Sequence, residues 1–143
     1  MGQQQLLLLI LGIIIISAAT IYGIQAFDEN RLKAREDSEV AKIMDLASRA
    51  QAWKAKPGLM GGGRESAPAD FSDFTVEKIG LKPSGGPAGS PYVEIPGAGC
   101  FRFFSHSDHL RINAINEDCV LGSWTKGVSI TGPTADDIAW SYR

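Results

Sequence analysis

Residues 1–27, MGQQQLLLLILGIIIISAATIYGIQAF, form the longest apolar stretch of this 143-residue chain. Leu6 to Phe27 contains no charged residue and would extend about 33 Å as an α-helix, while the hydrocarbon core of a bilayer is about 30 Å thick. From Leu6 to Ile16 only Gly12 interrupts the large apolar side chains, so no face of such a helix suits water. The stretch therefore predicts a helix that needs lipid or other helices on all sides.

The residues around this stretch differ from a removable secretory signal. Such a signal has a basic segment before a shorter apolar region, whereas three neutral glutamines precede Leu6 here. Ser17-Ala18-Ala19 is the one similarity to a cleavage site. Leu6 also stands where an N-myristoylation pattern needs Ser or Thr. We therefore expect the apolar segment to be retained.

The helical pattern continues beyond the apolar segment. Asp28-Glu29-Asn30-Arg31 contains no proline, so nothing forces the helix to end there. Apolar residues then recur on one face of a 3.6-residue period, at Val40, Ile43, Met44, Ala47, Ala50 and Trp53. Pro57-Gly58 and Gly61–Gly63 supply the stop. We predict one helix from about Gln3 to about Lys54, roughly 78 Å long, whose second half covers a sheet.

The rest of the chain has the pattern of a small antiparallel sheet with loops. Glycine and proline mark loops at 61–68 and 85–89, and residues 70–81 between them have room for one short helix. His106–Asp108 suits a hairpin turn. Short segments rich in β-branched and aromatic residues predict strands at 90–95, 100–105, 109–115, 127–132 and 138–143.

These patterns together predict an α+β fold, in which a long N-terminal helix packs on a small antiparallel sheet. They divide the chain into an apolar helix half at 1–27, an amphipathic helix half at 28–56, and a β-rich globular part at 57–143. The first boundary follows a change in composition, because every charged residue lies after Phe27. The second follows the helix stop at Pro57-Gly58.

Cys100 and Cys119 are the two cysteines of the chain. In an oxidising compartment a disulfide between them would close a loop of about 20 residues and stabilise the domain by about 3 kcal/mol. The alternative is two buried thiols in a reducing compartment. A hairpin centred on Ser107 would pair Cys100 with about residue 114, so Cys119 would lie beyond the ladder. A disulfide is expected, although the strand pairing alone does not force it.

Residues able to carry chemistry occur only in short polar clusters. Ser105–His109 holds hydroxyls, imidazoles and a carboxylate, but neighbours on an extended chain point to opposite faces and cannot converge as a triad. His106, Asp108 and His109 could hold a metal at a hairpin tip. Asp136-Asp137 and Glu117-Asp118 could attract calcium, but no EF-hand spacing is present. We interpret these clusters as solvated turns.

The glycine-rich segments and the overall charge exclude further classes. Gly61–Gly63 and Gly85–Gly89 follow no strand and lead into no phosphate-binding motif. The formal net charge of -2 gives no electrostatic basis for binding nucleic acid. We therefore expect no enzyme activity, no cofactor or metal, no nucleic-acid partner and no small-molecule substrate.

The layout resembles the type IV pilins and pseudopilins. The features that carry the resemblance are the apolar start, the unbroken helix from Met1 to about Trp53, the glycine-rich exit, and a small antiparallel sheet with a cysteine pair near the C-terminus. Members of that family pack their long helices in the centre of a filament and hold their sheet domains outside. Their subunits reside in the cytoplasmic membrane before assembly.

The resemblance implies a homopolymer, a pilus or fimbrium at the cell surface, that assembles through the apolar helix half. The assembly residues it implies here are Gln5, Leu6, Leu9, Gly12, Ile13, Ile16, Thr20 and Gly23. The sequence departs from the family at Gln5, where counting from Met1 places the family's glutamate, and its apolar half has no helix-breaking proline. No basic leader is evident, which leaves three alternatives: a leader removed before Met1, a short leader of Met1-Gly2, or no cleavage. These departures indicate a divergent filament subunit.

Two other functions fit the same pattern. One is a single-pass membrane protein whose extracytoplasmic domain binds a partner. Arg31, Lys33 and Arg35 follow the span while no basic residue precedes it, which by the positive-inside rule places the C-terminal domain in the cytoplasm, against export. The other is a minor pseudopilin of a secretion system, which sequence does not separate from a major pilin.

Overall fold

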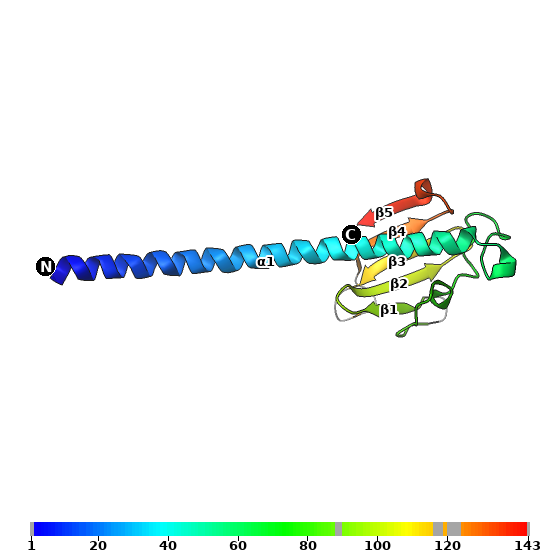
Figure 1. The fold of residues 1–143 in the computed structure, drawn as a ribbon. Coiled ribbons are helices and arrows are strands. Elements are labelled where there is room, and N and C mark those ends of the chain that lie inside the picture. The colour runs from blue at the N-terminus through cyan, green and yellow to red at the C-terminus, as the bar shows by residue number, and fades with distance from the viewer. Residues whose placement is uncertain (1, 88–89, 116–118, 120–123, 143) are drawn as a thin grey trace. The chain divides into compact units, whose positions relative to one another are not determined.

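The structure is a computed structural model that describes residues 2–87, 90–115, 119 and 124–142 (Figure 1). Its one α-helix among these residues, α1, runs from Gly2 to Ala55, within one or two residues of the predicted bounds. Five strands follow, which confirms the α+β class and the antiparallel sheet. The chain divides into two compact units, Met1–Asp37 and Ser38–Arg143.

Helix α1 has local reasons both to continue and to end. The hydroxyls of Ser17 and Thr20 donate to the carbonyl oxygens of Ile13 and Ile16, each at 2.8 Å, so these polar groups are satisfied within the helix. The end comes at Ala55, two residues before Pro57, which has no backbone N–H to donate. Gly61 then reverses the chain with a φ of 75°, a conformation that glycine adopts without strain.

The sheet is a meander in which each strand pairs antiparallel with the next, in the order β1-β2-β3-β4-β5 (Figure 1). Cys100 lies opposite Ile115 and Ser105 opposite Leu110, one residue from the predicted register. A bulge between Ala114 and Ile115 brings Trp124 into β4, so this strand begins before the predicted position 127. The strands are β1 Tyr92–Ile95, β2 Gly99–Ser105, β3 Leu110–Ile115, β4 Trp124–Ile130 and β5 Ile138–Tyr142.

Three short 3₁₀ segments lie outside the sheet: η1 Gly58–Met60, η2 Val76–Ile79 and η3 Ala135–Asp137. The second occupies part of the region where a short helix was expected. Val76 and Ile79 are its two buried residues, and both join the hydrophobic core.

The C-terminal part of α1 covers one face of the sheet (Figure 1). Most of the predicted stripe is buried there, but Met44 remains 41% exposed, while Leu46, which was not in that stripe, is fully buried. The helix contacts the sheet through positions spaced three or four residues apart, such as Ile43, Leu46 and Ala47. Met44 lies next to this buried face of the helix and is therefore partly exposed. The sheet contributes Val93, Phe101, Phe103, Leu110, Ile112, Ala114, Val128 and Ile130 to the core.

An aromatic cluster fixes the loop that follows α1. The rings of Trp53 and Phe74 meet edge to face with centroids 5.4 Å apart, and Phe103 of β2 lies 6.2 Å from Phe74. Trp53 Nε1 donates to the Gly61 carbonyl at 2.9 Å. A side chain at Gly63 would begin 2.6 Å from the Trp53 ring, so the loop closes tightly over the indole.

Lys54 is buried beside this cluster, which its charge did not predict. Its ammonium group donates to Ser66 Oγ and to the Asp70 carbonyl, each at 2.5 Å. Burial lowers the pKa of Lys54, and the carboxylates of Asp70 and Asp73 oppose that shift. The lysine therefore ties the loop to the helix through hydrogen bonds that compensate its desolvation.

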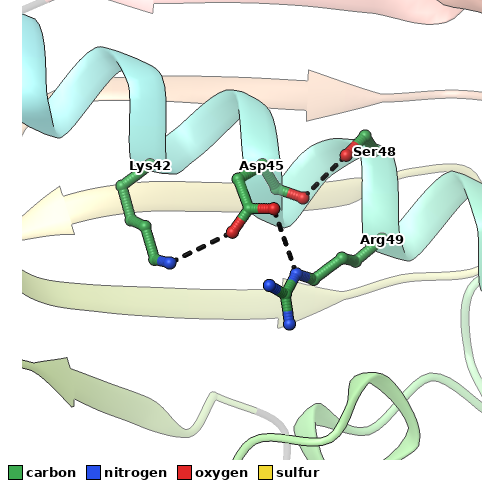
Figure 2. A network of polar contacts seen from close by, with 4 residues as sticks. All are labelled: Lys42, Asp45, Ser48 and Arg49. Atoms are coloured by element: carbon green, nitrogen blue, oxygen red, sulfur yellow. Dashed lines mark hydrogen bonds and ion pairs between the residues drawn. The ribbon is translucent and has the colours of Figure 1, made fainter.

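An ion cluster occupies the solvent side of the same helical segment. Figure 2 shows Lys42 and Arg49 reaching the carboxylate of Asp45 from either side, each at 3.1 Å, while Ser48 Oγ donates to the Asp45 carbonyl. The hydrogen bonds from Lys42 and Arg49 lower the pKa of Asp45 below 3.8. Folding thus favours the charged form of Asp45. The cluster therefore stabilises the fold at pH values above the ordinary pKa of an aspartate, and this effect is lost as pH falls through the lowered pKa.

Replacing Asp45 by asparagine should therefore have a small, pH-dependent cost. Its side chain is 38% exposed, so the expected loss at pH 7 is only about 0.3–0.5 kcal/mol. Urea unfolding of the two proteins at pH 7 and at pH 2 measures this difference. The two stabilities should converge at pH 2, and a difference of the same size at both pH values would contradict the assigned role.

Candidate functional site

The apolar half of α1 exposes a continuous hydrophobic surface. Its large side chains from Leu6 to Phe27 are between 49% and 73% exposed, on every side of the helix. A window of 18 residues in α1 is long and apolar enough to cross a membrane, and no described residue buries it. Covering one such side chain is worth about 1.5–3 kcal/mol, so this surface requires an apolar environment from outside the chain.

The predicted assembly residues share one side of that surface. Leu6, Leu9, Ile13, Ile16, Thr20 and Gly23 follow one another at alternating steps of three and four, the spacing of a helix-packing seam. Gln5 and Gly12 lie next to this seam. A Cβ atom added at Gly12 or Gly23 would meet nothing within 4 Å, so the fold of the chain itself does not require glycine at either position.

The structure joins Cys100 and Cys119 in a disulfide, with Cα atoms 5.5 Å apart, as predicted. Cys100 is buried in β2, and Cys119 lies after β3 with a φ of 52°, in the left-handed region. The link ties Cys119 to the start of β2. A disulfide of this kind is typical of exported domains.

Reducing this disulfide should lower the free energy of unfolding by about 3 kcal/mol, because the unfolded chain regains the entropy of a loop that spans 19 residues. Urea unfolding with and without reductant measures the effect, and a Cys100→Ser/Cys119→Ser variant controls for effects of the reductant on other groups. Rapid thiol labelling of both cysteines in unreduced, folded protein would contradict the disulfide.

The polar turns considered as metal sites have structural explanations. The rings of His106 and His109 stack with centroids 4.8 Å apart, and His109 Nδ1 contacts Asp108 Oδ1 at 2.8 Å. Asp137 closes a capping box with Thr134, whose hydrogen bonds lower the pKa of this carboxyl. Glu117-Asp118 lies outside the described residues. Within the described part of the chain, no group of three or more His, Cys, Asp or Glu residues could hold a metal ion.

Sequence reasoning missed a pocket on the sheet face that does not contact α1. β3 does not alternate buried with exposed residues, because Asn113 and Ile115 are buried as well as Ile112 and Ala114. A pocket of about 470 Å³ lies there. The sequence signal for it was polar residues on two neighbouring strands, Arg102 on one and Arg111 and Asn113 at alternate positions of the next. Without the pairing of the strands, such a pattern is also typical of a solvent-exposed sheet face.

No protein-family model, curated protein or solved structure matches this chain. The structure combines a long, apolar N-terminal helix with an antiparallel sheet and a disulfide. This combination is compatible with a pilin-like fold.

Proposed function

We propose that this chain is the structural subunit of a type IV pilus-like filament at the cell surface, held in the cytoplasmic membrane before assembly. The observation that carries the proposal is the apolar surface of α1 before Asp28, exposed on every side. A surface apolar all round suits both lipid and a bundle of identical helices, so one segment can serve as anchor and then as polymer core. This role is structural and needs no catalytic residue.

Several details favour packing against other helices. The hydroxyls of Ser17 and Thr20 are satisfied within their own helix, so a dry helix interface would leave neither of them unpaired. Gly12 and Gly23 leave open space in which a neighbouring backbone can approach. The contact would be head-to-tail rather than self-complementary. Such a contact produces a helical filament when the rotation from one subunit to the next does not close into a ring.

The unit Ser38–Arg143 has a core of its own, which supports a further expectation. A chain that starts at residue 28 should be soluble and monomeric, because it lacks the apolar surface and covers its amphipathic stripe internally. Size-exclusion chromatography measures this directly. A stable polymer of the truncated chain would place the assembly contacts outside residues 1–27.

A single-pass membrane protein with an extracytoplasmic binding domain is the second candidate, but the basic residues after the span favour a cytoplasmic domain instead. Arg31, Lys33 and Arg35 would hold the C-terminal domain in the cytoplasm. Against this stands the Cys100–Cys119 disulfide, which suits an oxidising compartment. A minor pseudopilin would share all of the chain's features and differ in abundance.

Negative-stain microscopy of material sheared from cells, with mass spectrometry of the same fraction, tests the proposal. We expect abundant thin filaments composed of this one chain. Recovery of the chain only in the membrane fraction would instead support the membrane-anchored candidate. Protease would cleave an extracytoplasmic domain in spheroplasts and leave a cytoplasmic domain intact. Filaments that contain the chain as a trace component would indicate the pseudopilin.

A further inference from the structure

A row of residues from neighbouring strands crosses the sheet face that carries the pocket, and two of them, Arg102 and Asn113, line it. Arg102 of β2 lies opposite Asn113 of β3, Asn113 opposite Gly127 of β4, and Gly127 opposite Ser141 of β5. Their neighbours Phe103, Ile112 and Val128 point into the core under α1, so this row faces the other side of the sheet. The pocket is lined by Arg102, Phe104, His106, His109, Arg111, Asn113, Ile115 and Trp124.

The lining carries fixed positive charge. The guanidinium of Arg102 lies 4.7 Å from the centroid of the Phe104 ring, and that of Arg111 lies 5.6 Å from the centroid of Trp124. Arg102 Nε also donates to Ser90 Oγ at 2.6 Å. No carboxylate occurs among the described residues that line the pocket. Two arginines held by aromatic rings, without an acidic partner in the lining, are suited to an oxyanion.

The floor of the pocket carries polar atoms that lack partners. Asn113 is only 4% exposed, yet its Oδ1 accepts no hydrogen bond, and the buried Nε of Arg111 donates none. Ser141 Oγ, across Gly127 and outside the lining, is also buried and unpartnered. A buried polar group that stays unsatisfied destabilises the protein, so the arrangement favours a bound group that supplies the missing partners.

Gly127, beside the lining, leaves room for the amide of Asn113. A Cβ atom at this position would lie 2.3 Å from Asn113 Oδ1 and 3.2 Å from Ser141 Oγ, so any other residue would displace the asparagine amide. The amide of Asn113 can both donate and accept, which matches a hydroxyl group. The requirements of the site are thus an oxyanion for the arginines and a hydroxyl for the amide.

We propose that this pocket binds a small hydroxylated oxyanion of the acidic-sugar class, a sugar that carries a carboxylate or a phosphate. Arg102 and Arg111 bind the oxyanion, and Asn113 bonds a neighbouring hydroxyl at the floor. The volume of about 470 Å³ is within the range of small-molecule sites. The proposal departs from the sequence-based expectation that the chain has no small-molecule ligand, and it holds whether or not the chain polymerises.

Isothermal titration calorimetry on the full chain in a non-ionic detergent tests the site at constant ionic strength. The probes are glucuronate, glucose 6-phosphate, neutral glucose and inorganic phosphate. At least one sugar anion should bind one-to-one and about tenfold more tightly than glucose and than inorganic phosphate. The preferred anion distinguishes the carboxylate from the phosphate. No binding of either sugar anion, or affinity equal to that of inorganic phosphate, would overturn the proposal.

Matched variants assign the contacts. Arg111→Gln should weaken binding of the preferred anion about tenfold, whereas Arg64→Gln, which removes an exposed arginine outside the lining, should leave it unchanged. Asn113→Leu should also weaken binding about tenfold, yet keep or raise the melting temperature of the ligand-free protein, because it removes an unpartnered amide. Equal affinity of both arginine variants, or an Asn113→Leu protein that binds normally or melts lower, would contradict the site.

Discussion

Replacing Ile13 by lysine should abolish filament assembly. Ile13 lies in the middle of the apolar half of α1 and is 56% exposed in the isolated chain. In a bundle of apolar helices the ammonium group would enter a dry interface without a partner, at a cost of several kcal/mol. Because assembly repeats the same contact, every added subunit would bear that cost. The measurement is filament yield at equal amounts of membrane-inserted subunit.

Gln5→Ala is the matched control for this result. The neutral amide of Gln5 can reach a terminal amine or carbonyl of a neighbouring subunit at a net gain of about 1 kcal/mol, without the desolvation cost of a buried carboxylate. Its loss should therefore weaken assembly only mildly. Normal filament abundance from the Ile13→Lys chain would show that the apolar helix is not the assembly core, and the membrane-anchored candidate would become the better one.

Trp53→Ala should have the largest effect on the stability of the domain, a loss of about 3–5 kcal/mol. The indole is almost fully buried, meets Phe74 edge to face, and donates to the Gly61 carbonyl. Its removal would leave a cavity at the end of α1 and free the loop that carries Gly63. Urea unfolding of the chain from residue 28 onward measures the loss.

Leu59→Ala is the control for this variant. Leu59 lies in the same loop region but is 98% exposed, so its truncation should change the free energy of unfolding by less than about 0.5 kcal/mol. If Trp53→Ala and Leu59→Ala had equally small effects, the aromatic cluster would not be part of the stabilising core.

The sequence predicted those elements whose signals are local. The bounds of α1 followed from an apolar run without proline and from the stop at Pro57, and four of the five strands began within two residues of their expected positions. β4 was placed late because its first residues pair only through a bulge, and a bulge is a property of two strands together. Leu46 was missed because the face that a helix buries depends on the sheet beneath it.

The candidate sites differ in the same way. The assembly residues from Leu6 to Gly23 were implied by the family resemblance, and their helical spacing is visible in the sequence. The sheet pocket could not, because its polar residues come from different strands, and an arginine on one strand is typical of a solvated face until the register sets it beside Asn113. Lys54 shows the same limit, since its burial depends on the carbonyl of Asp70, which the loop supplies.

Helical reconstruction of the surface filaments by electron cryomicroscopy would show whether the apolar helices form the filament core. We expect density for a central bundle of helices in which residues 6–23 contact neighbouring subunits, with the sheet domains outside it. Ile13 and Ile16 should lie within helix interfaces. Filaments whose contacts run only between sheet domains, with the apolar helix absent from the interfaces, would contradict the proposal that the apolar helices form the filament core.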